Sequence, residues 1–553
     1  MTKENKLIYD KCKKNINLIL SILSIATVVS IFLAAPFGLQ RIFQKEYISK
    51  DIYVKEKGLR RDTSSTNYLK ESINLLNNKI LIPSKKNNYW TYNGDMNEFK
   101  DKNRSDQRYL YSFFMLNDLV NAYTQSENVE YLKKGFAYLK DFYEQCPYDF
   151  EPVNNMPWHD ETTAQRQINT VRFYKAAKNF LDDDELKLMR DNLEFTANKL
   201  NTEMYSGFNN HGMFQDLSLY FYGKAFARPN FVSASTKRLQ EYFLKSFSSE
   251  GVHLENSPEY HFEMLYILKD FFNSVQSIDF GKYNQLVDIY KKSVRYSKAI
   301  ILPNGYLPNI GDTASIKVDL HDFYTDEELK DSNEKRNIFL DSGFDIYKKG
   351  ENYLAFIGPA YLSYHHHDHD LSFWLYKNGN IFTEVGKYGY DWDNPESKYV
   401  RTYPAHNSVV IDGEEEISPT VLDGEMLSLG DNKMAAISRR SQKAEVYREI
   451  DFDDDLAKIN VKTSIFPKDD KEKTYELYFH LAPEIKAVSS KDKNSMELFR
   501  AEEKIGTVHC KEKMELKKDK YYSRSYDKGQ KTQVIYIKTS GLEKHIDFEI
   551  NLK

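Results

Sequence analysis

Four of the chain's thirteen histidines lie together in residues 364–373, which read YHHHDHDLSF. Imidazole exchanges a proton near neutral pH, and it also binds metal ions. The segment contains two aspartates as well, Asp368 and Asp370, and it runs directly into an apolar, strand-like stretch. A cluster this dense at the edge of a sheet is difficult to explain by packing alone. It therefore predicts that this protein performs chemistry.

Four other segments carry residue types that could act with this cluster. They are WHDETTAQR (158–166), NNHGMFQD (209–216), ENSPEYH (255–261) and RTYPAHN (401–407). Taken singly, each has an ordinary explanation, such as a helix cap at Asn210, a core ring at Tyr260 or a surface ion pair at Arg166. Together they supply what proton abstraction beside a carboxylate needs, namely donors that neutralise the carboxylate, a base and an acid.

Length and charge exclude several classes of protein. The chain has 553 residues, more than one hydrophobic core usually serves, so at least two folded regions are expected. Its net charge is −5 with 29% charged residues, which gives no electrostatic case for nucleic acid as a partner. The sequence has no Gly-rich phosphate loop and no Gly-x-Ser-x-Gly motif.

The N-terminal segment predicts a membrane anchor. Residues 15–40 contain no charged side chain, and their apolar run is long enough to cross a bilayer as a helix. Five lysines precede it, so residues 1–14 are expected to stay in the cytoplasm and the bulk of the chain outside it, in a single-pass cell-membrane protein. A cleaved signal peptide is the alternative, although the apolar run is long for one. Residues 41–64 are polar and are predicted to form a stalk.

In the rest of the chain, the spacing of apolar residues changes once, from a helical period to the alternation of strands. Residues 65–335 show helical spacing, as in Leu186, Met189 and Leu193 after the N-cap candidates at 182–184. Residues 336–553 show strand alternation and turn signals, the clearest being Asn378-Gly379 between two apolar runs. We therefore expect helical hairpins in an array or toroid, followed by an antiparallel β-sandwich.

The segments NNHGMFQDLSLY, ENSPEYH, HHHDHDLSF and RTYPAHNSVVIDG, in this order, resemble the heparinase II/III-like polysaccharide lyases and their alginate lyase relatives. WHDETTAQR is similar to the helical region of the same family. The resemblance covers roughly residues 70–420 and implies an (α/α) toroid followed by a β-sandwich. It also implies β-elimination at the C4–O bond of a uronic acid in an acidic polysaccharide, with no organic cofactor.

The resemblance implies roles for individual residues. Asn210 and His211 would meet the substrate carboxylate, and Tyr260 would act as the acid and also as the base for one C5 configuration. His365 would be the second candidate base. The residues expected to bind the sugars are Trp158, His159, Arg166, Glu255 and Arg401.

A metal site is also implied, with zinc held by His367, Glu384 and His406. Two imidazoles and a carboxylate suit zinc better than calcium, and such a site would order the cluster rather than catalyse. The chain departs from the family at His369, where an aspartate is common, and at Glu384, where the family's ligand is usually aspartate. If Asn378-Gly379 forms a two-residue turn, Glu384 pairs with Phe373, and His367 lies about 20 Å away along an extended strand. The histidine segment must then fold back, or the register differs, or Glu384 is no ligand.

Two other functions stay open at this point. One is a non-catalytic glycan-binding or polysaccharide-export factor on the same fold, because fold does not fix function. The other is a glycoside hydrolase on an (α/α) toroid, with carboxylates such as Asp160, Glu255 or Asp312. The anchor favours an enzyme that trims an exopolysaccharide made by its own cell over one that forages.

Overall fold

The computed structural model describes residues 67–82, 89–150, 155–274, 280–330, 335–389, 394–525 and 528–553. The predicted cytoplasmic tail (1–14), membrane anchor (15–40) and stalk (41–64) lie outside the described residues. Among the helices that are described, none has the length and apolar composition needed to cross a membrane. One compact unit contains Arg60–Leu268 and Ile278–Lys553, so the helices and sheets that carry the predicted site belong to the same unit.

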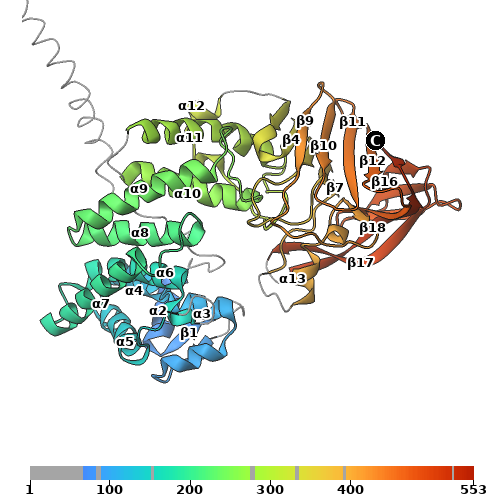
Figure 1. The fold of residues 1–553 in the computed structure, drawn as a ribbon. Coiled ribbons are helices and arrows are strands. Elements are labelled where there is room, and N and C mark those ends of the chain that lie inside the picture. Colours follow the sequence, from blue (N-terminus) through green and yellow to red (C-terminus); the bar gives the residue numbers. More distant parts are fainter. Residues whose placement is uncertain are drawn as a thin grey trace, which may run out of the picture. The chain divides into compact units, whose positions relative to one another are not determined.

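The described chain begins with helices and ends with strands, as predicted (Figure 1). The helical part also contains a small hairpin of β1 (Lys79–Leu81) and β2 (Tyr89–Thr91). Its α-helices are α2 (Tyr68–Leu76), α3 (Arg104–Tyr111), α4 (Met115–Ser126), α5 (Glu130–Gln145), α6 (Asp160–Ala177), α7 (Asp183–Asn201), α8 (Asn210–Ala225), α9 (Pro229–Ser246), α10 (Pro258–Ser274), α11 (Phe280–Ile300) and α12 (Asp326–Leu329). Short 3-10 turns lie between them, at η2 (Met96–Asp101), η3 (Met156–Trp158) and η4 (Leu320–Asp322).

Local sequence explains where these helices begin. Asp182 caps α7 through a capping box, in which its side chain accepts from the backbone N–H of Glu185 and the Glu185 side chain accepts from Asp182. Asn209 caps α8 by accepting from the backbone N–H of Gly212. α6 packs against α7 and α8, and α8 packs against α9. The first turn of α8 is therefore fixed both by its cap and by its neighbours.

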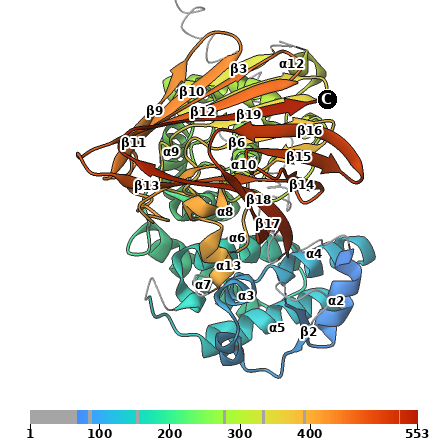
Figure 2. The ribbon, with the colours of Figure 1, turned by 90° about the vertical axis from the view of Figure 1, so that its right-hand side faces the viewer.

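The strands of the described residues form three larger antiparallel sheets. The first contains, in order, β3 (Arg336–Phe339), β4 (Phe344–Lys349), β5 (Asn352–Ile357), β6 (Phe373–Lys377) and β7 (Asn380–Phe382). The second contains β17 (Met514–Ser525), β18 (Lys528–Gly541), β13 (Lys473–His480) and β8 (Val409–Ile411). The third, whose strands lie side by side in Figure 2, contains β14 (Ile485–Ser489), β15 (Ser495–Arg500), β16 (Glu503–Cys510), β19 (Lys544–Leu552), β12 (Lys458–Pro467), β11 (Ala444–Phe452), β10 (Lys433–Ser438) and β9 (Gly424–Ser428). Short helical turns η5 (Leu340–Ser342), α13 (Pro395–Tyr399) and η6 (Tyr403–Ala405) interrupt this part.

One apolar core joins these sheets. The burial of β11 alternates residue by residue, as a strand with one face in a core must. Phe479 of β13 stacks on Phe548 of β19 with ring centroids 3.9 Å apart, so the second and third sheets pack face to face. Phe373 of β6 lies in the same core and contacts Phe479. β6, which follows the histidine segment, is thus anchored in the centre of the sheet-rich part.

The predicted hairpin at Asn378-Gly379 is confirmed. It joins β6 to β7, and both turn residues have positive φ, 51° and 129°. Leu375 pairs with Phe382, and a register shift follows toward the turn. β7 ends at Phe382, so the predicted pairing of Glu384 with Phe373 lies beyond the ladder.

Candidate active site

Two of the predicted catalytic residues lie against each other. Tyr260 is in the first turn of α10, and His365 precedes β6. Their rings are stacked, with centroids 3.7 Å apart and an interplanar angle of 19°. Tyr260 is buried, and the His365 side chain is 14% exposed. The contact brings the helical and sheet-rich parts together at the two groups that are expected to move protons.

Three chain segments meet where His365 is held, and each turns sharply there. Asn256, Gly311 and His365 all have positive φ, at 55°, 54° and 53°. A Cβ atom on Gly311 would lie 2.5 Å from the carbonyl oxygen of Asn256 and 3.0 Å from that of His365, so only glycine allows this approach. The Asn256 side chain donates to the carbonyl oxygens of Leu362 and Tyr364, at 2.6 and 2.9 Å. These contacts fix the backbone that leads into the predicted base.

Asp312 is the centre of the polar contacts at this junction. One carboxylate oxygen lies 2.9 Å from Nδ1 of His365, and the other lies 3.0 Å from Nε2 of His367 and 3.4 Å from Arg401. Burial opposes ionisation of Asp312, but Arg401 and the two histidines hold the pKa of this carboxyl well below its usual range. Glu255, predicted to bind sugar, is buried with a carboxylate oxygen 3.5 Å from Nε2 of His365.

The predicted carboxylate-binding residues begin α8. Asn210 is its first residue and His211 its second, so both lie at the positive end of the helix dipole. The His211 ring lies between two acids of α6, with Nδ1 3.0 Å from Asp160 and Nε2 3.3 Å from Glu161. Its side chain is 33% exposed, which leaves it accessible to a ligand.

Acidic and neutral groups surround His211 on α6. Burial alone would raise the pKa of Asp160. Hydrogen bonds from His211 and Ser206 lower that pKa by more than burial raises it, so the pKa of Asp160 is below its ordinary value. Burial lowers the pKa of His159 to about 4, so this imidazole is neutral at physiological pH. His159 is buried, and its ring lies 5.4 Å from that of His211. His159 thus packs against the buried side of the His211 ring.

Trp158 and Arg166, both predicted to bind sugar, are buried core residues, as His159 is. Arg166 is 3% exposed and donates to the carbonyl oxygens of Tyr111 and Pro157, while its guanidinium lies over the Trp158 ring at 4.9 Å. Trp158 is 5% exposed, and its indole N–H donates to the carbonyl oxygen of Cys146. The motif predicts that they lie near the site, but both side chains point into the protein and are used to pack α6.

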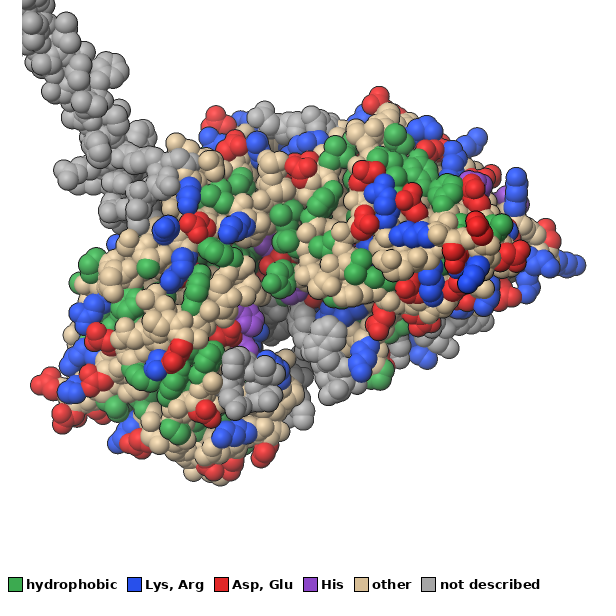
Figure 3. All heavy atoms as spheres, in the orientation of Figure 1, with side chains coloured by type: hydrophobic (Ala, Val, Ile, Leu, Met, Phe, Trp, Pro, Cys, Tyr) green, Lys and Arg blue, Asp and Glu red, His purple; other side chains and the backbone are tan. Residues whose placement is uncertain are grey.

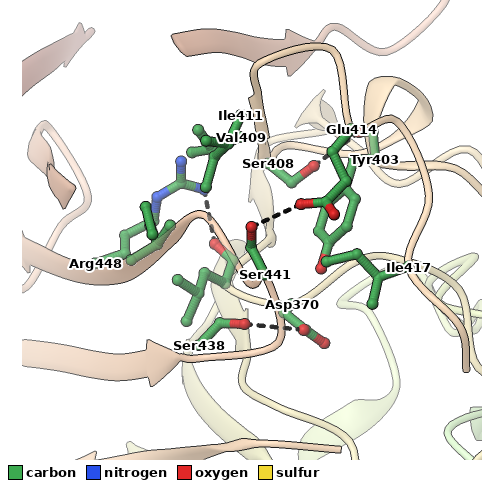
Figure 4. Close-up of a pocket in the computed structure, with 13 residues that line it drawn as sticks. Asp370, Tyr403, Ser408, Val409, Ile411, Glu414, Ile417, Ser438, Ser441 and Arg448 are labelled. Atoms are coloured by element: carbon green, nitrogen blue, oxygen red, sulfur yellow. Dashed lines mark hydrogen bonds between the residues drawn. The ribbon is translucent and has the colours of Figure 1, made fainter. Parts of the chain in front are cut away.

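The acids of the histidine segment are structural. Asp368 and Asp370 both pair with the buried guanidinium of Arg440, at 2.9 and 3.2 Å. His366 lies 3.3 Å from Asp370. Asp370 also accepts from Ser438 at the edge of a small pocket of about 20 Å³, room for one water molecule (Figure 4). These contacts anchor the segment to the sheets.

The candidate metal ligands differ from the predicted set in one residue. His369, Glu384 and His406 each place a ligand atom within 4.8 Å of the others. His367 was predicted in place of His369, but its Nε2 is held by Asp312. The segment folds back through turns between His367 and Ser372, which is why His369 reaches Glu384 although an extended strand would not. All three ligand candidates are buried.

The donor atoms fit a bound cation. Within the part of the chain that is described, Nδ1 of His369, Nε2 of His406 and Nδ1 of His367 are buried without a hydrogen-bond partner. Burial lowers the pKa of His367 to about 3 and that of His369 well below its ordinary value, so both rings are neutral. Neutral imidazoles with an unused nitrogen beside a carboxylate are the donors that zinc prefers.

The structure brings several of the predicted residues together around Asp312, which the sequence does not single out. Asp312 was considered only as a hydrolase carboxylate, whereas it is committed to two histidines and an arginine. A hint in the sequence is the neighbouring Gly311, because glycine permits a close backbone approach. Figure 3 shows histidine and acidic side chains together in a hollow on one face of the molecule.

Comparisons with known proteins agree with this fold. No curated protein sequence matches the chain. The crystal structure of a heparinase III matches with a TM-score of 0.74 and 14% identity, over 95% of this chain and 91% of that one. A heparan sulfate lyase from Pedobacter heparinus gives 0.61 and 14%, over 94% and 90%. A chondroitin AC lyase from Streptomyces coelicolor gives 0.53 and 8%, over 93% and 83%.

Family models settle the relationship. The model described as heparinase II/III N-terminus matches residues 55–331, and the one described as heparinase II/III-like, C-terminal, matches residues 331–550. Together they cover the helical and the sheet-rich parts. The chain therefore belongs to the heparinase II/III-like family of polysaccharide lyases.

Proposed function

We propose that this chain cleaves a uronic-acid-containing polysaccharide by β-elimination. In this reaction a base takes the proton from C5 of the uronate, and the electron pair of the C5–H bond forms a C4–C5 double bond. The C4–O bond breaks, and an acid protonates the departing oxygen. The step also needs donors at the carboxylate, because they stabilise the negative charge that develops when C5 loses its proton.

The residues of the site can divide these tasks. Asn210 and His211 bind the uronate carboxylate, helped by the positive end of α8. His365 takes the C5 proton, and Tyr260 protonates the leaving oxygen. For the opposite C5 configuration Tyr260 serves as both base and acid. Arg401 and Glu255 border the same groups and contact the sugars. Trp158, His159 and Arg166 support the site from the core.

The observation that carries this proposal is the stacking of His365 on Tyr260. It sets an imidazole and a phenol side by side where α10 meets the segment that leads into β6. One bound uronate then has proton-transfer groups within reach of both its C5 proton and its leaving oxygen at C4, which is the geometry that general acid–base catalysis requires.

We further propose that zinc is bound by His369, Glu384 and His406, with His367 alongside. The buried imidazole nitrogens without partners support this proposal. When bound, zinc would order the segment that carries His365 and would take no part in proton transfer.

We also propose that the helices form an (α/α) toroid and the sheets a β-sandwich. Residues 15–40 would anchor the chain in the cell membrane, with its bulk on the extracytoplasmic side. The uncharged, apolar composition of residues 15–40 supports the anchor. A tethered lyase would act on an acidic exopolysaccharide made by its own cell.

The proposal is tested with the purified full-length chain and a panel of uronate polymers, including the capsule of the source cell. β-Elimination leaves a C4–C5 unsaturated uronate, which absorbs in the ultraviolet, whereas hydrolysis leaves saturated ends. Absence of ultraviolet-absorbing product across the panel contradicts the proposal.

Tyr260→Phe is the sharpest variant for this test. It keeps the ring stacked on His365 and removes only the proton-bearing oxygen, so we expect kcat to fall by about 10²–10⁴-fold. Tyr266→Phe, the same change further along α10, is the matched control and should retain the wild-type rate. A Tyr260→Phe variant as active as the control would exclude Tyr260 as the acid.

A further inference from the structure

We propose that Asp312 is a positioning residue that orients His365 for proton transfer and links it to the histidines of the metal-site candidate. The inference rests on the proposed function and extends it to a residue outside the substrate contacts. Its basis is geometric, since one buried carboxylate contacts Nδ1 of His365 with one oxygen and Nε2 of His367 with the other.

The contact decides which nitrogen of His365 serves the substrate. An ionised carboxylate only accepts hydrogen bonds, so Nδ1 of His365 must carry its proton toward Asp312. Nε2 is then the nitrogen that exchanges a proton with the sugar. Glu255 lies 3.5 Å from Nε2, so this nitrogen faces the side where the sugar is proposed to bind. The stacked Tyr260 ring fixes the tilt of the imidazole.

The second oxygen of Asp312 contacts a histidine on the side away from the proposed substrate. It accepts from Nε2 of His367, whose ring lies 5.5 Å from that of His406. Metal-binding histidines are commonly oriented by a hydrogen bond from their second ring nitrogen to a carboxylate. Here the carboxylate of Asp312 contacts both the proposed base, His365, and His367, which lies beside the proposed metal ligands. A movement of the proposed metal ligands would therefore change the orientation of His365 through His367 and Asp312.

The backbone around Asp312 is held independently of its carboxylate. Ser257 and Thr313 share a hydrogen bond of 2.8 Å between their hydroxyls, and the backbone N–H of Ala314 donates to Glu259 at 2.7 Å. These contacts attach residues 313–314 to the start of α10. The side chain of Asp312 can therefore be changed with the segment still in place.

Asp312→Asn is the variant that tests the inference. An amide matches the carboxylate in shape but has one oxygen, so it can accept from only one of the two histidines and presents N–H groups to the other. In the full-length chain we expect kcat to fall at least about 100-fold, with KM changed less than about threefold, because the base is disordered while the carboxylate-binding residues on α8 are untouched. Asp345→Asn, at another buried aspartate that pairs with an arginine, should leave both constants unchanged.

A double variant separates positioning from general loss of structure. If Asp312 acts through His365, Asp312→Asn should cost nothing further in a His365→Ala background. Equal losses in both backgrounds would overturn the inference, as would an Asp312→Asn enzyme with wild-type kcat.

The inference can also be measured without turnover, so that it stands apart from the proposed function. In protein with ¹⁵N-labelled histidine, the His365 signals are assigned by their loss in His365→Ala. We expect long-range ¹H–¹⁵N spectra to show a protonated Nδ1 in the wild type and a changed pattern in Asp312→Asn. An unchanged His365 spectrum refutes the role of Asp312 even if the wild type is an active lyase. An inactive wild type with the expected spectra would refute only the reaction.

Discussion

At the residue scale, neighbours decide what each histidine of the cluster can do. His365 meets a phenol ring and a carboxylate at the edge of the site, where it is partly exposed. His366 faces Asp370, which is already committed to Arg440, and so helps to hold the segment in place. His369 is buried with an unused nitrogen, and burial keeps it neutral. In the proposed site, one residue type would thus serve proton transfer, structure and metal binding because burial and partners differ at each position.

The ligand set of the metal site makes a prediction at this scale. We expect His369→Ala to lower zinc affinity by at least about 10–100-fold, because it removes a direct ligand. Zinc per chain is measured by mass spectrometry after dialysis against a graded chelator. His261→Gln, a buried histidine on α10 that hydrogen-bonds Ser297, is the control and should retain the metal.

His367→Ala completes this comparison. If His369→Ala keeps its zinc and His367→Ala loses it, then the ligand set expected from the sequence is the right one. If neither loses zinc, the metal is bound elsewhere or not at all.

At the scale of elements, the first turn of α8 and the edge of β6 are where the chemistry is positioned. Asn209 accepts from the backbone N–H of Gly212 and donates to the carbonyl oxygen of Ser206, both at 2.9 Å. The cap therefore fixes the chain on both sides of Asn210 and His211. It also leaves the positive end of the helix directed at the place where the uronate carboxylate is proposed to bind.

Two substitutions at this cap separate stability from binding. Asn209→Ala should cost about 1 kcal/mol of stability, the usual loss for a cap. Asn209→Asp keeps the acceptor for Gly212 and loses only the donor to Ser206, so it should lose less stability than Asn209→Ala, but its negative charge beside Asn210 repels the substrate and should raise KM several-fold. Unfolding in urea and steady-state kinetics measure the two effects.

The control lies on the neighbouring helix. Asp182→Ala removes the cap of α7 and should lose a similar amount of stability without changing KM. If Asn209→Asp leaves KM at the wild-type value, the start of α8 does not bind the carboxylate.

Local signals predicted these elements well, and non-local contacts explain what was missed. The Asn378-Gly379 hairpin and the Asp182 cap depend on neighbours in sequence, so their patterns were sufficient. Asp312 gains its role only where three distant segments meet, and no spacing in the sequence encodes that meeting. Asp312 was not expected at the site, whereas Arg166 was expected there as a sugar-binding residue. The motif of Arg166 predicts that it lies near the site, but it does not show that its guanidinium points into the core.

At the scale of the whole molecule, many histidines are buried in a neutral state in both the helical and the sheet-rich parts. Burial lowers the pKa of His261 to about 3, that of His159 to about 4 and that of His367 to about 3. In the unfolded chain each regains a value near the ordinary 6.5. Between the folded and unfolded values the unfolded state binds more protons, so acid favours unfolding.

This linkage predicts a chain that loses stability steadily as the pH falls below about 6.5. The stabilising effect of each neutral histidine is complete above its unfolded pKa and is lost toward its folded pKa, at a limit of about 1.4 kcal/mol per pH unit for one group.

His261 is the cleanest case, because it lies on α10 away from the metal-site candidates and hydrogen-bonds Ser297. The free energy of unfolding in urea, measured from pH 7.5 to 5.0, should fall steeply in the wild type and less steeply in His261→Gln. His321→Gln, at an exposed histidine, should follow the wild-type slope. Parallel curves for wild type and His261→Gln would mean that His261 is protonated to the same extent in the folded and unfolded chains.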